Sequence, residues 1–82
     1  MGKHYTYIVE CIDKSLYTGY TTDLEARIHK HNAGKGAKYT KTRRPVRLKY
    51  YEIYDTKSEA LKREYAIKRL TRQQKIALIE ER

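Results

Sequence analysis

Apolar and polar residues alternate from position 5 to position 12, as they do along a strand with one buried face. Asp13 and Lys14 then supply a tight turn, and residues 15–20 continue the alternation. Two short alternating runs on either side of a two-residue turn are typical of antiparallel pairing. We therefore expect a β-hairpin near the start of the chain.

A third run, over residues 46–54, is rich in Val, Leu, Ile and Tyr. Its period of two slips near Tyr50 and Tyr51, which predicts a third strand with a β-bulge at that point. A chain of 82 residues has room for a single hydrophobic core. We therefore expect the three strands to belong to one sheet, in one domain that spans residues 1–82.

Capping boxes, in which Thr is followed three positions later by Glu or Gln, predict where three helices begin. The three pairs are Thr22 with Glu25, Thr56 with Glu59, and Thr71 with Gln74. We expect the first helix to end near Asn32, before Ala33 and Gly34, the second near Leu70, and the third at the C-terminus. The predicted fold is an α/β domain of order ββαβαα, with helices covering a small three-stranded mixed sheet.

The charge balance points to a partner. The chain has 19 Lys and Arg residues against 10 Asp and Glu, a net charge of +9. This excess favours a polyanion, with nucleic acid first and an anionic membrane surface second. No apolar run approaches the roughly 20 residues of a transmembrane helix, so we expect no membrane partner. A single cysteine, Cys11, is typical of the reducing cytosol, and we expect a cytoplasmic monomer.

The segment from residue 33 to residue 45 differs from the rest of the chain, because it holds five cations and no acidic residue. One interpretation is a solvated, mobile loop. We favour contact with phosphate, because no carboxylate of the segment balances these charges. Its candidate nucleic-acid-binding residues are Lys35, Lys38, Tyr39, Lys41, Arg43 and Arg44.

The predicted first helix carries an Arg and a His beside its apolar face. Leu24, Ile28 and His31 fall on one stripe that should face the sheet, and Arg27 lies beside that stripe, one turn before His31. Such a pair can form a cationic site that transfers protons. An Arg that extends over apolar surface to solvent, beside a partly buried structural His, explains the pattern equally well.

A carboxylate interrupts the apolar stripe of the second long helix. Glu64 shares this stripe with Ala60, Leu61 and Ile67. Burial of an unpaired carboxylate is unfavourable by several kcal/mol, so a Lys, an Arg or a divalent metal must compensate it. We expect Glu64 to approach Arg27, either in a structural salt bridge or in a metal site.

The segments 5–7 (Tyr-Thr-Tyr) and 17–19 (Tyr-Thr-Gly) resemble the paired signature of the GIY-YIG nuclease superfamily. Arg27, His31 and Glu64 follow in the order and at the spacing of the other residues of that family's site. Similarity to small stand-alone bacterial GIY-YIG proteins extends over nearly the whole chain. Tyr and Thr replace the first Gly and the central Ile of the signature, and neither position carries the chemistry.

The resemblance implies an endonuclease that hydrolyses phosphodiester bonds with one divalent ion, Mg²⁺ or Mn²⁺, in DNA with structural features. Glu64 would bind the metal, which stabilises the leaving oxygen. Arg27 would clamp the scissile phosphate, and Gly19 is placed among the nucleic-acid-binding residues. Two tyrosines would position the attacking water, and the general base stays open among three residues: Tyr7, Tyr17 and His31.

Two other functions fit the same resemblance. One is a non-catalytic nucleic-acid-binding module that keeps the fold and the charge. The other is a nuclease subunit that depends on a protein partner, which could also supply specificity. Glu64 favours the nuclease, because a binding module has no need of an inward-facing carboxylate amid so much positive charge.

Overall fold

The computed structural model describes residues 2–81, which form one three-stranded sheet with helices on both faces. The strands are β1 (His4–Glu10), β2 (Leu16–Thr21) and β3 (Arg47–Tyr54). Their order is β2-β1-β3, and both neighbouring pairs are antiparallel. The expectation of a mixed sheet is therefore wrong. The strand β3 runs in the direction of β2 but pairs with the opposite edge of β1, so no two parallel strands are neighbours.

The predicted hairpin and the predicted bulge are both present. The strands β1 and β2 pair directly across a short connection. Along β3 the register passes from the pair Ile8 and Tyr50 to the pair Val9 and Leu48, which leaves Lys49 unpaired. The bulge thus lies one residue earlier than the slip in the sequence pattern suggested.

Four helices complete the fold, one more than expected: α1 (Leu24–Asn32), α2 (Lys38–Lys41), α3 (Lys57–Lys68) and α4 (Arg72–Glu80). Thr56 and Thr71 cap α3 and α4 as predicted. The cap of α1 is Asp23 and not Thr22, because the Asp23 carboxylate accepts the amide hydrogen of Ala26 at the positive end of the helix. The short helix α2 changes the order to ββααβαα.

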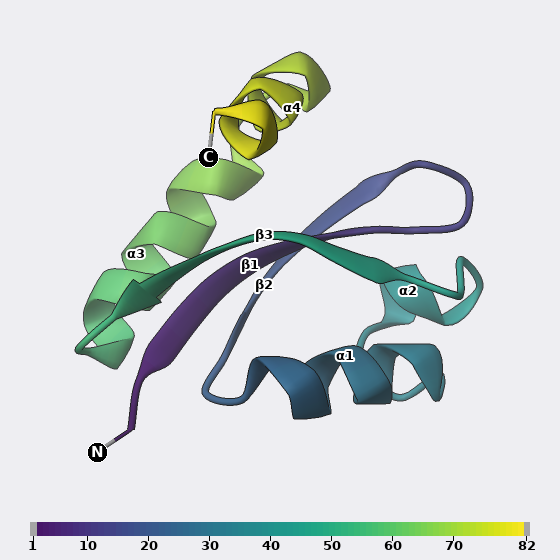
Figure 1. The fold of residues 1–82 in the computed structure, drawn as a ribbon, viewed down its shortest axis with the longest axis horizontal. Helices are drawn as coiled ribbons and strands as arrows, with labels where there is room; N and C mark the ends of the chain where they lie inside the picture. The colour runs from purple at the N-terminus through teal and green to yellow at the C-terminus, as the bar shows by residue number, and fades with distance from the viewer. Residues whose placement is uncertain (1, 82) are drawn as a thin grey trace.

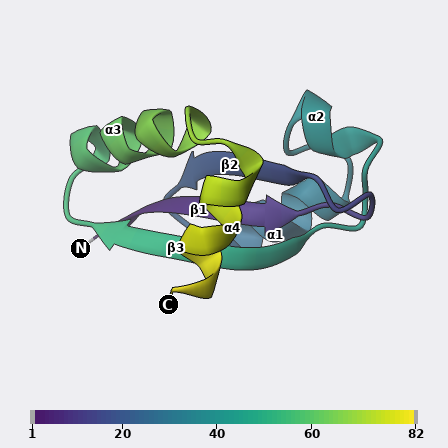
Figure 2. The ribbon, with the colours of Figure 1, turned by 90° about the horizontal axis from the view of Figure 1, so that it is seen from above.

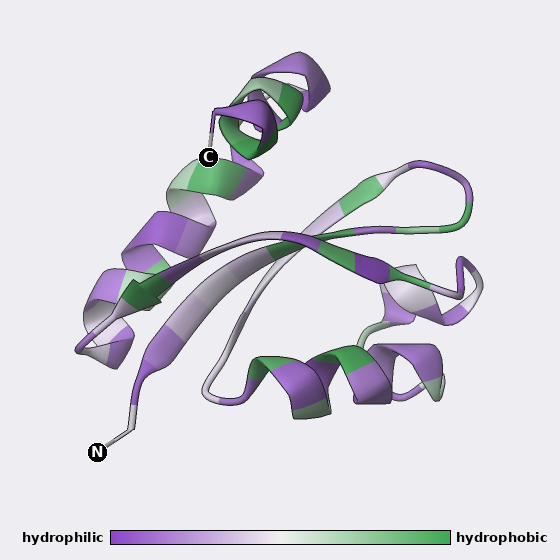
Figure 3. Cartoon of the chain, viewed as in Figure 1, coloured by the Kyte–Doolittle hydropathy of each residue, from purple (hydrophilic) through white to green (hydrophobic). Residues whose placement is uncertain are grey.

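The helices lie in two layers separated by the sheet. Figure 1 shows α1 on one face of the sheet, with α3 and α4 on the other. Seen from above in Figure 2, α3 runs on the β2 side of the sheet and α4 crosses over the strands. In Figure 3 the hydrophobic side of α1 is turned toward the sheet. No helix within residues 2–81 is long and apolar enough to span a bilayer.

Alternation along β1 builds both halves of the core. Tyr7 and Val9 face α1, whereas Ile8 packs with Ile67 on the side of α3 and α4. On that second side the Thr6 hydroxyl donates a buried hydrogen bond of 2.6 Å to the Ala60 carbonyl of α3. The central strand therefore fixes α3 directly, while its neighbouring positions supply the face that meets α1.

Candidate active site

Tyr7 reaches the β2 side of the sheet by passing over a glycine. Its partner on β2 is Gly19, where an ideal Cβ would lie 2.5 Å from the Tyr7 Oη and 2.6 Å from its Cζ. Both contacts are shorter than real Cβ contacts, so any side chain at this position would displace the phenol. Gly19 is buried under the ring. It therefore makes room for the Tyr7 phenol and presents no exposed surface to phosphate.

A buried histidine holds the phenol. The Tyr7 Oη lies 2.8 Å from Nε2 of His31, and Nδ1 of the same ring lies 2.8 Å from the Thr40 Oγ1. The Thr40 hydroxyl donates its single proton to the Ala37 carbonyl at 3.2 Å, so it accepts from Nδ1–H of the imidazole. The Nε2 atom is then unprotonated and accepts the hydrogen of the Tyr7 hydroxyl.

Two residues that position His31 were not predicted from the sequence. Thr40 is fully buried on α2, and an ideal Cβ at Gly36 would lie 2.4 Å from Nδ1 of His31. Helix α2 therefore folds onto the imidazole, and the middle part of the 33–45 segment is a short helix rather than an irregular loop. The only sequence pattern that marks these two residues is a Gly followed four positions later by a Thr. This pattern is too short to predict a contact with His31.

A ladder of rings leads from His31 to the surface. The Tyr17 ring packs edge-on against His31 with centroids 5.4 Å apart, and it stacks on Tyr39 with centroids 5.8 Å apart. The Arg43 guanidinium lies 4.0 Å from the centroid of the Tyr39 ring. Tyr17 is only partly buried, and its hydroxyl makes no hydrogen bond within the described part of the chain. This hydroxyl is available to water or to a ligand.

Charged residues from both helix layers affect the pKa of Tyr7. Burial raises the pKa of the Tyr7 phenol, with the neighbouring Tyr17 and Glu64 acting in the same direction and Arg27 opposing them. Arg27 belongs to α1 and Glu64 to α3, so the two charged residues come from helices on opposite faces of the sheet. Contacts therefore join Tyr7, Tyr17 and His31 directly, whereas Arg27 and Glu64 act on the Tyr7 phenol by charge from opposite faces of the sheet.

The carboxylate of Glu64 has a different partner from the one expected. Its side chain is 17 % exposed and pairs with Lys68, four residues along α3, at 3.0 Å. The predicted salt bridge with Arg27 is therefore absent, because a cation one turn away on the same helix reaches the carboxylate first. Arg27 keeps its charge free to act on the phenol and on an incoming anion.

The two arginines of the 33–45 segment tie that segment to the body of the domain. Arg43 pairs with Asp13 at 3.1 Å, so a carboxylate from outside the segment balances one of its five cations. Arg44 donates to the carbonyls of Lys41 and Asn32. Three lysines of the segment have neither an ion pair nor a side-chain hydrogen bond given by the structure among the described residues: Lys35, Lys38 and Lys41.

The donor set suits a hard cation that is held by one carboxylate. Residues 2–81 contain no group of three or more His, Cys, Asp or Glu side chains able to enclose a metal. Mg²⁺ requires no such group, because it keeps several waters and binds through one or two carboxylates together with substrate phosphate. Glu64 is a carboxylate whose charge acts on Tyr7, and it fits this role.

Comparison with known proteins shows the family to which the chain belongs. The GIY-YIG catalytic domain matches residues 3–77, so the chain belongs to the GIY-YIG family of nucleases. It is 70 % identical to the UPF0213 protein of Staphylococcus haemolyticus and 66 % identical to that of Staphylococcus aureus, over 100 % of each chain. This family membership confirms the resemblance inferred from the sequence.

Two solved solution structures share the fold. One is the UPF0213 protein of Bacillus halodurans, with a TM-score of 0.64 and 50 % identity over 98 % of this chain and 85 % of that one. The other is a protein of E. faecalis, with a TM-score of 0.67 and 47 % identity over 99 % of this chain and 86 % of that one. The α/β architecture is therefore common to these bacterial relatives.

The stability of the domain should depend on pH through His31. Burial and the nearby charge of Arg27 lower the pKa of His31 below its ordinary value of about 6.5. As the pH falls, His31 therefore becomes protonated in the unfolded chain before it does so in the folded chain. Below about pH 6.5 the free energy of unfolding decreases by up to about 1.4 kcal/mol per pH unit, until the pKa of the folded state is reached. Thermal unfolding from pH 8 to pH 5 measures this loss.

A second histidine on the same helix provides the control. His29 is exposed on α1, so His29→Gln should leave the pH dependence of unfolding unchanged. His31→Gln should flatten it, whatever its stability at pH 8. Equal pH dependence in wild type and His31→Gln would show that another group is responsible.

Proposed function

We propose that the protein is a metal-dependent endonuclease that hydrolyses phosphodiester bonds in nucleic acid, with structured DNA as the substrate. The observation that carries this proposal is the hydrogen bond from Tyr7 to His31, in a group that also includes Arg27 and Glu64. A phenol with a proton acceptor on one side, a cation nearby and a carboxylate at the edge suits hydrolysis of an anionic ester.

The three candidate bases differ in what they can touch. His31 and Tyr7 are both buried, and they differ in hydrogen-bonding capacity: both ring nitrogens of His31 have partners, whereas the Tyr7 oxygen donates to His31 and keeps a lone pair that can accept from a water. Tyr7 can take a proton from water while its own proton passes to Nε2 of His31. This coupled transfer avoids a free phenolate, which the raised pKa of Tyr7 disfavours. We therefore assign Tyr7 as the general base and His31 as the final proton acceptor.

Tyr17 and Arg27 place the reactants. The Tyr17 hydroxyl has no partner within the described residues and can hold the attacking water. Arg27 presents a forked cation to the scissile phosphate and to the charge that develops on it during attack. The bound phosphate also offsets the positive charge that His31 acquires when it takes the proton.

Glu64 would hold the divalent ion together with water and substrate oxygens. When bound, Mg²⁺ supplies positive charge next to the leaving oxygen. Lys68 now pairs with this carboxylate, and its flexible side chain can move to a phosphate when the ion takes its place.

The size of the domain limits what it can recognise. Its longest dimension is 31 Å, which is less than one turn of duplex DNA at roughly 34–36 Å. A chain this small cannot read a long sequence on its own. Recognition by shape, or with the help of a protein partner, therefore fits the proposed function better.

The direct test is an assay with branched, nicked, single-stranded and duplex DNA and with RNA, each incubated with Mg²⁺, Mn²⁺ or EDTA. We expect cleavage of at least one structured DNA with either metal and none in EDTA. A panel in which every substrate is bound and none is cleaved would instead favour a non-catalytic binding module. Activity that appears only after a partner is added would indicate a nuclease subunit.

The unpaired lysines of the 33–45 segment should contribute to binding without affecting the chemistry. Lys38→Gln with Lys41→Gln should reduce the slope of log affinity against log salt by about 0.9 for each lost phosphate contact on duplex DNA. The cleavage rate at saturating substrate should stay unchanged. Titrations at several salt concentrations measure the slope.

The matched control removes two charges from other parts of the surface, with Lys3→Gln and Lys49→Gln. Neither residue lies in the 33–45 segment. If both double variants change the slope equally, the effect reflects net charge and the segment does not contact phosphate.

A further inference from the structure

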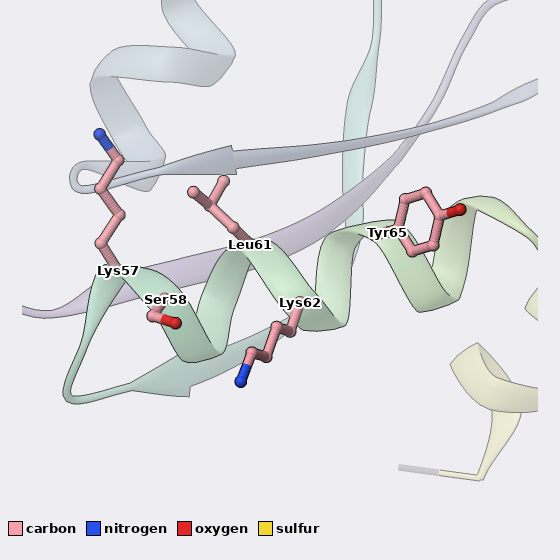
Figure 4. A pocket seen from close by; sticks show the side chains of 5 residues that line it. All are labelled: Lys57, Ser58, Leu61, Lys62 and Tyr65. Atoms are coloured by element: carbon pink, nitrogen blue, oxygen red, sulfur yellow. The ribbon is translucent and has the colours of Figure 1, made fainter.

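An apolar patch lies open on α3 beside the proposed metal-binding residue. Leu61 is 39 % exposed and Tyr65 is 65 % exposed, although both are large apolar or aromatic side chains. With Lys57, Ser58 and Lys62 they line an open depression of about 600 Å³. Figure 4 shows Lys57, Leu61 and Tyr65 along one side of the helix, with Lys62 pointing away from them. We call this group the α3 patch.

Glu64 lies at one edge of the α3 patch. Residues on a helix are rotated by about 100° each, which places Glu64 about 60° from Leu61 and about 100° from Tyr65. On the opposite side of α3, Arg63 pairs with Glu52 of β3 at 2.8 Å. The patch thus continues outward from Glu64, away from β3.

A contact between Lys57 and β2 also shows that the α3 patch lies on the β2 side of the sheet. The Lys57 ammonium lies 5.9 Å from the centroid of the Tyr20 ring on β2. The strand β2 also carries Tyr17 and Gly19 of the proposed active site. A nucleic acid that reaches Glu64 along the β2 side of the sheet therefore meets the α3 patch next.

The charges around the patch fit a nucleotide. Lys57 and Lys62 line the depression, and no carboxylate does. The Arg69 guanidinium lies 5.6 Å from the centroid of the Tyr65 ring and donates to its hydroxyl at 3.4 Å. An exposed aromatic face among cations binds a base by stacking and its phosphates by charge. A purely apolar partner would leave these cations unpaired.

We propose that Tyr65 stacks on an unpaired base of the substrate, next to the phosphate held at Glu64, and that Leu61 supports the same base. This inference rests on the proposed nuclease function and narrows its substrate class. In a continuous duplex both faces of each base are covered by its neighbours. A side chain that stands on a helix can therefore stack only on a base that is terminal, flipped or single-stranded.

The test is binding in EDTA, so that cleavage cannot interfere. The probe is a ten-nucleotide DNA single strand with one 2-aminopurine, a base whose fluorescence falls when it is stacked. A blunt duplex of about 40 base pairs, in which the terminal bases are a small fraction of the binding sites, serves as comparison. We expect wild-type protein to quench the probe, and Tyr65→Leu to bind the single strand about tenfold more weakly. Duplex binding should change by less than twofold.

Two further variants make the result specific to stacking. Tyr65→Phe keeps the ring and should bind the single strand like wild type. Ile12→Ser changes another exposed apolar residue, 60 % exposed and away from α3, and should have no effect. Unchanged single-strand binding by Tyr65→Leu, or equal weakening on both DNAs, overturns the proposal. So does sedimentation that shows a dimer of this chain in wild type and a monomer in Tyr65→Leu.

The same variants separate this proposal from the proposed function. If wild type cleaves DNA and Tyr65→Leu loses no selectivity for unpaired nucleotides, the nuclease assignment stands and the stacking role is wrong. If wild type cleaves none of the substrates while Tyr65→Leu still loses single-strand binding, the stacking surface stands and the nuclease assignment is wrong.

Discussion

Glu64→Gln is expected to lower the rate of phosphodiester cleavage by about 10³-fold, while the fold and the binding of nucleic acid stay nearly unchanged. The substitution keeps the size of the side chain and removes the charge that a divalent ion needs. Its pairing partner Lys68 is half-exposed and can return to solvent, so little stability should be lost. Single-turnover cleavage with Mg²⁺, together with thermal unfolding, measures both effects.

The matched control is Glu59→Gln, an exposed carboxylate in the first turn of the same helix. It should cleave at the wild-type rate. A wild-type rate for Glu64→Gln as well would contradict the metal-binding role. A variant at position 64 that unfolds would instead show that the carboxylate serves stability.

Gly19→Ala should disrupt the centre of the proposed site with a single methyl group. The new Cβ would lie 2.5 Å from the Tyr7 Oη, so the phenol must leave its position against His31. Forcing a methyl group into packed surroundings destabilises a domain by about 1–3 kcal/mol. Displacement of a reacting group by about 1 Å lowers the rate by about 10²-fold. We therefore expect both the melting temperature and the cleavage rate to fall.

Gly2→Ala is the matched control, because nothing lies within 4 Å of its ideal Cβ. Cleavage and unfolding should be measured under conditions in which Gly19→Ala is fully folded, so that lost activity does not reflect lost protein. Full activity of folded Gly19→Ala would mean that the contact between Tyr7 and His31 is not needed for catalysis.

Local rules predicted the parts of the fold that depend on neighbours in sequence. The hairpin followed from alternation, and the caps at Thr56 and Thr71 followed from their own side chains, which bond to amides three residues away. The position of the bulge was predicted to within one residue for the same reason. The cap at Asp23 shows the limit, because two adjacent polar residues competed for the same helix start.

Features that depend on distant pairing were not predictable. The antiparallel sheet requires β3 to choose the far edge of β1, and no local pattern encodes that choice. The same holds for Thr40, which gains its role when α2 folds onto His31. The partner of Glu64, by contrast, was local. Lys68 lies one turn away on the same helix, whereas the prediction named the more distant Arg27.

Two adjacent residues of β1 hold the helices on the two faces of the sheet. Thr6 holds α3 through its hydrogen bond to Ala60, and the next residue, Tyr7, holds α1 through His31. The spacing between the two halves of the proposed site is therefore set by the thickness of the sheet and not by the connecting loops. Insertions between β3 and α3 should leave that spacing intact, whereas a transplant of the two helices onto another sheet would not reproduce it.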